Sequence, residues 1–553
     1  MFLLSRIVFL LLFLACAPFR LAAAEPPPAV SPSSTSPGSL LPEGGFSAVD
    51  GATGRPAGWP ASAAASWPVE AGNRFLRLTS TASGAMDNIR LEAPIPAGVR
   101  ALEFSYRGRV SELKRGEKPF HDARVIINFK NAAGDSLGSA PPSYHRNSTA
   151  DWRVFTSRFL VPEGATILEF MPTLFRVRGG VFDLDDIVLR PTDPAPVEAE
   201  IARKRPPTPP APEVANPEKW PAELFVVGNK LQDKSGREVW LQGVNVASME
   251  WNVKGENVLA SVVVAIEKWN ANVIRLPTKD QYWFGKGEDQ TDGGAAYRAL
   301  VDEVVKYASN RGAYVVLDLH NYRAPRPEHI DFWTDAATRY KNHPAVLFDL
   351  LNEPHGISWE VWRNGGYVQE RKAGADEDNF LSEEDKIQAK LGFRSPGMQR
   401  MLEVVRETGA RNVVVAGGLD YAYDLSGIVN GFALEEKGGN GVMYASHIYP
   451  WKRDWQGKAL DAAALHPILI GEVGADFKKQ PWENEANFVP PETWLPDMLG
   501  LIQKHRLHWT GWCFHVSAGP AMLADWRYTP TSYWGDYARR ALAGERFELQ
   551  RLR

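Results

Sequence analysis

Two glutamates follow short apolar stretches of the chain and could meet at one site. Glu353 comes after the run Val346–Leu351, and Glu472 closes the apolar part of the segment ILIGEVG. Short apolar runs of this kind predict strands buried on both faces, as in a parallel sheet. Carboxyl groups at the carboxyl ends of such strands stand in the usual place for catalysis, and a pair of them can cleave a glycosidic bond. On its own, Asn352-Glu353-Pro354 is more typical of a simple turn than of a catalytic site.

Other polar residues end neighbouring apolar runs in the same manner. A barrel rim needs none of them for packing, so their convergence is typical of a site. The candidates are Arg275, His320, Asn321, Asn352, His447, Tyr449 and Trp512.

Elements that would position these side chains alternate between strand and helix signals from Trp220 onward. Helix-length segments separate the strands, for example Val258–Asn270, Ala295–Arg311 and Gly397–Thr408. Eight strands with crossovers predict an α/β fold, a (β/α)8 TIM barrel over residues 220–553. The predicted strands are Val239–Val246, Asn272–Leu276, Ala313–His320, Val346–Asn352, Val413–Ala416, Val442–His447, Ile468–Glu472 and Thr510–Phe514.

The order of the motifs RLP, LDLHNY, NEP, HIYP, GEVG and GWCFH resembles glycoside hydrolase family 5, the cellulase family of clan A. The resemblance covers the whole barrel and implies a retaining hydrolase. All eight positions normally shared by that family are matched here, namely Arg275, His320, Asn352, Glu353, His447, Tyr449, Glu472 and Trp512.

The resemblance also implies a role for each residue. Glu353 would be the acid/base and Glu472 the nucleophile, an assignment that the residues alone leave open. Arg275 would keep Glu472 ionised, and Tyr449 would donate a hydrogen bond to it. Trp512 would offer a flat face to the pyranose ring next to the cleaved bond.

The remaining candidates are polar groups around that pair. Asn352 suits the sugar 2-hydroxyl, and His320 and His447 complete a polar floor. Asn321 has two interpretations, as a binding residue or as a residue that only pins a loop. His515 has no assigned role.

Five tryptophans follow predicted strands and are candidate platforms for outlying sugars, with a loop-core role as the alternative for each. They are Trp251, Trp283, Trp451, Trp455 and Trp482. The long acidic loop 370–390 after the fourth strand is expected to wall the cleft on the leaving-group side of Glu353.

The expected activity is that of a secreted endo-β-1,4-glucanase acting on a β-glycan by double displacement. A β-mannanase or another β-glucanase of the same family is the alternative, and a non-catalytic polysaccharide-binding protein is the alternative from another class. We expect a monomer without metal or cofactor. The formal net charge of −4 does not favour a nucleic-acid surface.

Residues 40–190 have a different pattern, in which short runs of alternating apolar and polar residues lie between turn signals. They predict an all-β jelly-roll sandwich, and GGFS, RPAGWP and GVFDLDDIVLR loosely resemble carbohydrate-binding modules. An accessory sandwich that binds nothing is the alternative. Asp183, Asp185 and Asp186 are interpreted as edge acids or as ligands of a structural Ca²⁺.

The remaining segments predict export and spacing. Residues 1–24 have the pattern of a signal peptide, so a secreted or periplasmic location is expected. Cys16 offers lipid attachment as the less favoured alternative. Residues 25–39 read as a Pro/Ser-rich spacer, and 191–219 as a Pro-rich, semi-rigid extended linker. No run after the signal is long enough for a transmembrane helix.

Overall fold

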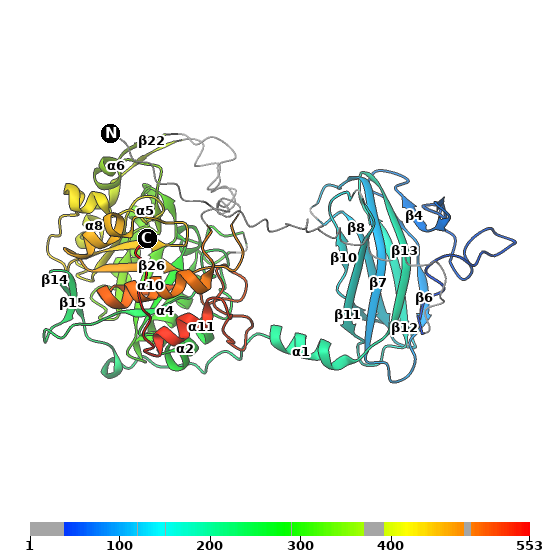
Figure 1. Ribbon diagram of the computed structural model, residues 1–553, viewed down its shortest axis with the longest axis horizontal. Helices are drawn as coiled ribbons and strands as arrows, with labels where there is room; N and C mark the ends of the chain where they lie inside the picture. The colour runs from blue at the N-terminus through cyan, green and yellow to red at the C-terminus, as the bar shows by residue number, and fades with distance from the viewer. Residues whose placement is uncertain (1–37, 119, 150, 289, 370–391, 481–487) are drawn as a thin grey trace, which may run out of the picture. The chain divides into compact units, whose positions relative to one another are not determined.

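The computed structural model describes residues 38–118, 120–149, 151–288, 290–369, 392–480 and 488–553 (Figure 1). It divides into two compact units, Met1–Ala202 and Arg203–Arg553. The predicted signal peptide, Cys16 and the acidic loop 370–390 lie outside the described residues, as does Trp482.

The first unit consists of antiparallel sheets. A five-stranded sheet has the order β1 (Ala65–Ser66), β4 (Leu76–Thr79), β13 (Gly179–Pro191), β7 (Ala101–Lys114), β11 (Arg153–Leu160). A six-stranded sheet has the path β10 (Ser143–His145), β8 (Ala123–Lys130), β12 (Ile167–Phe175), β5 (Met86–Asn88), with β6 (Leu91–Pro94) paired to β12 and β9 (Ser136–Ser139) to β8. A small ribbon joins β2 (Val69–Glu70) and β3 (Asn73–Arg74).

Alternation along the strands builds the core of this unit. Phe104 and Tyr106 of β7 are buried in the same cluster as Ile127 and Phe129 of β8, which belong to the other sheet. Successive residues of a strand point to opposite faces of its sheet. The buried residues at every second position therefore lie on one face of each sheet, and these two faces pack against each other. The prediction of an all-β sandwich is confirmed.

Three acids on β13 are paired with arginines. Arg77 Nε lies 2.7 Å from Asp183 Oδ1, and Arg107 contacts both Asp185 and Asp186. A second arginine, Arg109, lies 2.9 Å from Asp183. Guanidinium groups therefore neutralise these carboxylates, which argues against the Ca²⁺ interpretation. The edge interpretation is also wrong for Asp183 and Asp185, because β13 is the central strand of its sheet and both side chains are buried.

The predicted extended linker contains a helix, α1 (Pro194–Lys204), and a 3₁₀ turn, η1 (Pro217–Lys219). The expectation of an extended chain is therefore wrong over α1. Pro194 and Pro196 stand in its first turn, where an amide N–H has no helical partner and proline is tolerated.

The second unit is a closed barrel of eight parallel strands, and the predicted (β/α)8 fold is confirmed. The strands are β16 (Gln242–Asn245), β17 (Val273–Thr278), β18 (Tyr314–Leu319), β20 (Val346–Asp349), β24 (Val414–Gly417), β25 (Val442–Ile448), β26 (Ile468–Val473) and β27 (His508–Gly511). Every residue of β17, β18 and β26 is buried, as expected for parallel strands covered on both faces.

Helices cover the outside of the barrel (Figure 1). They are α2 (Val258–Trp269), α3 (Asp280–Trp283), α4 (Ala295–Ser309), α5 (Glu328–Arg339), α6 (Trp359–Asn364), α8 (Gly397–Glu407), α9 (Asp461–Ala463), α10 (Pro491–His505) and α11 (Gly535–Leu542), with π-helical turns η3 (Ile428–Phe432) and η4 (Gln456–Leu460). Two-stranded ribbons join β14 (Leu224–Val227) to β15 (Lys230–Asp233), β19 (Tyr322–Arg323) to β21 (Glu353–Pro354), and β22 (Gly366–Val368) to β23 (Phe393–Ser395).

The eighth strand is displaced from its predicted position. It spans His508–Gly511 rather than Thr510–Phe514, so Trp512 lies beyond the strand end. The apolar residues Cys513 and Phe514 misled the prediction, because they are buried in the following loop rather than in the barrel sheet.

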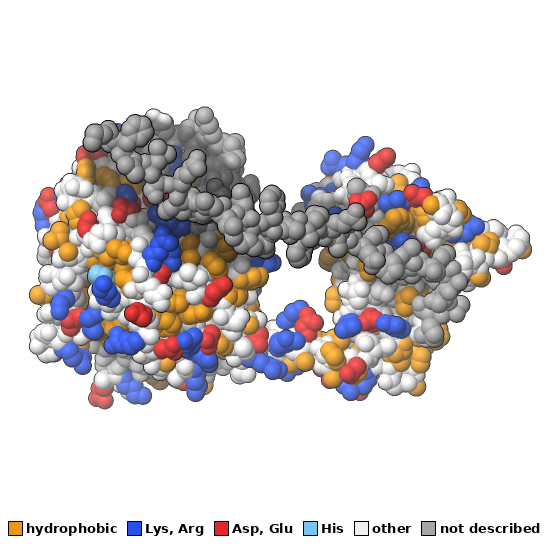
Figure 2. Space-filling model, in the orientation of Figure 1, with side chains coloured by type: hydrophobic (Ala, Val, Ile, Leu, Met, Phe, Trp, Pro, Cys, Tyr) orange, Lys and Arg blue, Asp and Glu red, His pale blue; other side chains and the backbone are white. Residues whose placement is uncertain are grey.

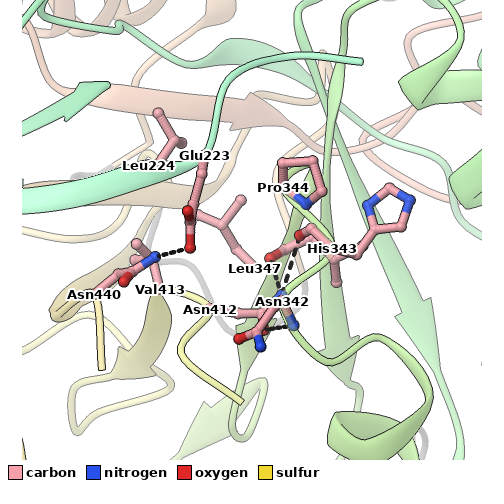
Figure 3. A pocket seen from close by; sticks show the side chains of 10 residues that line it. Glu223, Leu224, Asn342, His343, Pro344, Leu347, Asn412, Val413 and Asn440 are labelled. Carbon is pink, nitrogen blue, oxygen red and sulfur yellow. Dashed lines mark hydrogen bonds between the residues drawn. The ribbon is translucent and has the colours of Figure 1, made fainter. Parts of the chain in front are cut away.

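A small pocket lies at the amino ends of the barrel strands (Figure 3). Asn412 just before β24 donates to the carbonyl of Val346 at 2.9 Å, and Asn440 donates to Glu223 at 2.8 Å. This end of a TIM barrel serves stability, whereas catalysis occupies the opposite end. The site is therefore sought where the strands finish.

Charged side chains of both signs are interspersed over the face shown in Figure 2. Within the described ranges, no helix has the length and apolar character that crossing a membrane requires.

Candidate active site

Arg275 of β17 lies at the centre of the site and is fully buried. Its Nη1 lies 3.2 Å from Glu472 Oε1, and its Nη2 lies 3.1 Å from Asp318 and 2.9 Å from Asp349. The same guanidinium donates to the side-chain oxygens of Asn245 at 3.0 Å and Asn352 at 2.8 Å. A rigid fork with five donors is suited to such a network, and it fixes the ends of several strands relative to one another.

Glu472 of β26 is held from two directions. Arg275 contacts one carboxylate oxygen, and the hydroxyl of Tyr449 donates to the other at 2.6 Å. Burial raises the pKa of Glu472, while Arg275, His320 and the Tyr449 hydrogen bond oppose that rise. The ionised form of Glu472 thus has both a counter-charge and a hydrogen-bond donor.

Glu353 stands in β21, where it pairs with Tyr322 of β19. Its Oε1 lies 3.1 Å from Nδ1 of His447. Burial, followed by the nearby charge of Glu472, raises the pKa of Glu353 well above its ordinary value. Among the described residues, Glu353 also lacks the guanidinium contact that favours the ionised form of Glu472.

The two carboxyl groups are close neighbours. One oxygen of Glu353, one oxygen of Glu472 and a ring nitrogen of His447 all lie within 4.8 Å of one another. A short separation of about 5 to 5.5 Å suits direct attack on a sugar carbon, whereas about 6.5 to 9.5 Å leaves room for a water. The geometry favours double displacement.

Two histidines line the same floor. His447 is fully buried and is the register partner of Glu472, and burial lowers the pKa of its ring well below the usual value. His320 contacts Asp318 through Nδ1 at 2.7 Å, and burial lowers its pKa to about 3. Both rings are therefore neutral near pH 7 and act by position and hydrogen bonding.

Trp512 is a half-buried ring at the edge of the site. It stacks on His320 with ring centroids 5.5 Å apart and planes 11° apart, and its indole N–H donates to the carbonyl of Gly519 at 3.1 Å. These contacts fix the ring plane, which gives a flat apolar surface for a sugar.

Asn321 has partners that belong to a loop network. Its amide N donates to Asp280 at 2.7 Å and lies 3.0 Å from His329, while its oxygen accepts from Lys279 at 2.7 Å. These contacts support the interpretation that Asn321 pins a loop.

The donor types of Glu353, His447 and Glu472 would also suit a divalent cation. Arg275 already supplies a positive charge to Glu472 at 3.2 Å, so the carboxylates are compensated without a metal.

Sequence reasoning missed two buried acids and a lysine. Burial raises the pKa of Asp318 to about 7 and that of Asp349 to about 8. Each acid interrupts an otherwise apolar strand, YVVLDL or VLFDLL, and a buried acid needs a cationic partner. That signal called for a cation, which the structure identifies as Arg275. Lys452 in the loop after β25 gave no comparable signal.

The predicted tryptophan platforms separate into two groups. Trp283 and Trp455 are fully buried, so the platform interpretation is wrong for both and they belong to the core. Trp451 stacks on Tyr449 with centroids 5.0 Å apart. Trp251 remains 41% exposed, and its indole N–H donates to Glu256 at 3.0 Å. Glu256 in turn lies 3.3 Å from His515, which gives that histidine a structural role.

Curated relatives of this chain are endoglucanases. The endoglucanase of Paenibacillus polymyxa is 25% identical over 355 residues, with 54% of this chain and 82% of that protein covered. The endoglucanase of Microbulbifer sp. (strain ALW1) is 23% identical over 306 residues, with 52% of this chain and 50% of that protein covered. The chain thus spans about half the length of the Microbulbifer relative.

Among solved structures, a β-glucanase of Saccharophagus degradans aligns with a TM-score of 0.44 at 21% identity, covering 61% of this chain and 97% of that one. The profile of the cellulase family, glycosyl hydrolase family 5, matches residues 232–517. That range is more than half of the 553 residues and contains Arg275, Glu353 and Glu472. The chain belongs to the cellulase family, glycosyl hydrolase family 5.

Proposed function

We propose that the protein is a retaining glycoside hydrolase, an endo-β-1,4-glucanase, with Glu353 as acid/base and Glu472 as nucleophile. The observation that carries the proposal is the pairing of the half-buried carboxyl group of Glu353 with the buried one of Glu472. Their oxygens approach within 4.8 Å, but their hydrogen-bond partners differ. Arg275 and Tyr449 contact Glu472, whereas a neutral histidine contacts Glu353.

In the first step, a carboxylate oxygen of Glu472 attacks the anomeric carbon. The bond from that carbon to the leaving oxygen breaks, and Glu353 transfers its proton to the leaving oxygen. The products are a free sugar end and a glycosyl ester on Glu472. The raised pKa of Glu353 supports this role, because the group stays protonated at a pH where an ordinary glutamate is ionised.

In the second step, Glu353 is a carboxylate and accepts a proton from an incoming water. The water oxygen attacks the anomeric carbon, and the ester bond to Glu472 breaks. Two inversions restore the β configuration, and both carboxyl groups return to their starting states. Asn352, fixed by its 2.8 Å hydrogen bond from Arg275, is placed to meet the sugar 2-hydroxyl.

The choice of a β-1,4-glucan rests on the names of the relatives, which are endoglucanases. A polymer of this size is met outside the cell, and the predicted signal in residues 1–24 supports export. The monomeric state remains a prediction.

A reducing-sugar assay across carboxymethylcellulose, mannan, xyloglucan, xylan and mixed-linkage glucan tests the substrate. We expect the highest kcat/KM on carboxymethylcellulose or mixed-linkage glucan. A preference for mannan would replace the glucanase assignment with a mannanase. Absence of release from every polymer would leave a polysaccharide-binding protein.

We further propose that the first unit binds polysaccharide. Its six-stranded sheet carries Tyr144, which is 47% exposed, and Arg124 lies 4.8 Å from the centroid of that ring. An exposed aromatic ring held by a fixed guanidinium is suited to stacking on a pyranose.

Deleting residues 40–190 tests this second role. We expect the loss of activity on insoluble cellulose to exceed the loss on soluble cello-oligosaccharides, because a tether raises local concentration without changing the chemistry. Both activities are measured on the deleted and full-length proteins after thermal melts have been compared. An equal loss on both substrates would mean that the unit only supports the barrel.

A further inference from the structure

A turn of unusual backbone geometry lies beside Glu353. Three consecutive non-glycine residues after β24 have left-handed φ angles, with Asp420 at 54°, Tyr421 at 61° and Ala422 at 58°. L-residues disfavour this region, and side chains visit it mostly as single residues. A run of three persists only where surrounding contacts determine it, and such geometry concentrates at functional sites.

The contacts that hold the turn lead to the acid/base segment. The backbone N–H groups of Tyr421 and Ala422 both donate to the carbonyl of Pro354, at 3.1 and 3.4 Å. The Tyr421 ring stacks on His355 with centroids 4.0 Å apart and planes 15° apart. The N–H of His447 donates to the carbonyl of Ala422 at 3.3 Å. The turn thus contacts Pro354 and His355, the two residues after Glu353. It also accepts a hydrogen bond from the backbone of His447, whose ring contacts the Glu353 carboxyl group.

Lys452, in the loop after β25, stabilises the turn through hydrogen bonds to Asp420. Its Nζ donates at 2.8 Å both to the backbone carbonyl and to the carboxylate of Asp420. The same ammonium lies 5.6 Å from the Tyr421 ring centroid and 5.1 Å from that of Tyr423. Lys452 is only 9% exposed, so the charge is held in a partly desolvated position.

We propose that Lys452 and the turn Asp420–Ala422 form a positioning element for Glu353, which sets the orientation and the proton affinity of the acid/base. The inference rests on the proposed function and adds to it a structural element that acts through the proton transfers of Glu353 and not through the nucleophile. Neither the lysine nor the turn needs to contact the substrate.

The electrostatic part follows from the groups that face Glu353. Burial and Glu472 raise the pKa of Glu353, and the positive charges of Lys452 and Arg275 lower it. The groups around Glu353 are Glu472 of β26, Arg275 of β17, Asp318 of β18, Tyr322 of β19, His447 of β25, and Tyr449 and Lys452 of the loop that follows β25. Of the two cations, Arg275 contacts Glu472, Asp318 and Asp349, whereas the carboxylate that Lys452 contacts, Asp420, lies in the turn and outside the pair of site glutamates.

Lys452→Met in the full chain is the direct test. The variant is assayed over a range of pH on a cello-oligosaccharide, whose leaving group needs a proton, and on an activated aryl cellobioside, whose leaving group does not. We expect kcat/KM on the oligosaccharide to fall about 10-fold or more. We expect kcat/KM on the aryl substrate, which reports the first step alone, to stay within about 3-fold. The alkaline limb of the oligosaccharide profile should move to higher pH, because loss of the cation lets Glu353 keep its proton longer.

Three further variants separate positioning from simple support. Lys452→Arg keeps the charge and should leave the alkaline limb near that of the wild type. Asp420→Asn removes the anion that compensates Lys452, so the limb should move to lower pH, opposite to Lys452→Met. Lys458→Met is the matched control, since Lys458 of η4 binds Asp424 at 2.7 Å, and Lys452 and Arg275 are the cations that chiefly lower the pKa of Glu353. It should change neither the alkaline limb nor the ratio of the kcat/KM values on the two substrates.

The proposal is overturned if Lys452→Met lowers kcat/KM equally on both substrates with an unmoved alkaline limb, or changes nothing. If Lys452→Met fails to fold, the other two variants decide. The proposal is then overturned if the alkaline limb of the pH profile shifts in the same direction in Lys452→Arg and in Asp420→Asn. A wild-type protein without hydrolytic activity would instead refute the proposed function, so the two failures are distinguishable.

Discussion

Glu472→Ala is expected to lose at least about 10⁴-fold in kcat on cello-oligosaccharides, because it removes the nucleophile of the first step. The fold should survive the change. Arg275 keeps its ion pairs with Asp318 and Asp349, at 3.1 and 2.9 Å, so no unpaired buried cation is left behind. The measurement is the initial rate of reducing-sugar release, together with a thermal melt of each protein.

Two controls accompany that variant. Glu472→Gln preserves the shape and a hydrogen-bonding oxygen but cannot form the ester, so it should be as inactive as Glu472→Ala. Glu407→Gln alters an exposed carboxyl group of α8 and should match the wild type. Residual activity of Glu472→Ala within about 10-fold of the wild type would place the nucleophile elsewhere.

The second large effect concerns Glu353→Ala. On a cello-oligosaccharide we expect a loss of about 10²- to 10⁴-fold in kcat, because the leaving oxygen no longer receives a proton. On an activated aryl cellobioside, the first step should still proceed, since Arg275 and Tyr449 still prepare Glu472. Release of the aryl group should therefore show a burst followed by slow turnover, for want of a base in the second step.

The pH profile gives an independent reading of the same substitution. In the wild type, Glu353 must be protonated to act, so activity on the oligosaccharide falls as pH rises through its raised pKa. Glu353→Ala lacks that group, and the burst on the aryl substrate should show no corresponding alkaline fall. A burst with the same alkaline fall as the wild-type oligosaccharide profile would assign the acid to another residue.

Much of the barrel could be predicted because local pattern and tertiary structure agree there. Runs such as VLFDLL and ILIGEV are buried on both faces, as parallel strands must be, and polar residues follow them at the rim. Trp512 was placed inside a strand because Cys513 and Phe514 are apolar, and burial in a loop looks the same in sequence as burial in a strand.

What the sequence could not supply were contacts between distant loops. The grip of Lys452 on Asp420 joins residues 32 positions apart, and neither side chain has a distinctive local pattern. The left-handed turn could not be predicted either. Glycine is the usual sequence signal of a positive φ angle, and Asp420, Tyr421 and Ala422 include none. Asp318 and Asp349 were visible as acids inside apolar runs, but their common partner Arg275 appears only in the closed barrel.

The central claim is that Glu353 is the acid/base and Glu472 the nucleophile of a double displacement. Added azide tests it most directly, because azide needs no deprotonation and its product records the face of attack. With Glu353→Ala and an aryl β-cellobioside, azide should attack the glycosyl ester on Glu472 and give the β-glycosyl azide. With Glu472→Ala, azide should replace the missing nucleophile in a single displacement and give the α-glycosyl azide. The anomeric proton in the NMR spectrum of each product decides between them. An α product from Glu353→Ala with a β product from Glu472→Ala would reverse the two roles, and full hydrolysis by both variants would contradict the account.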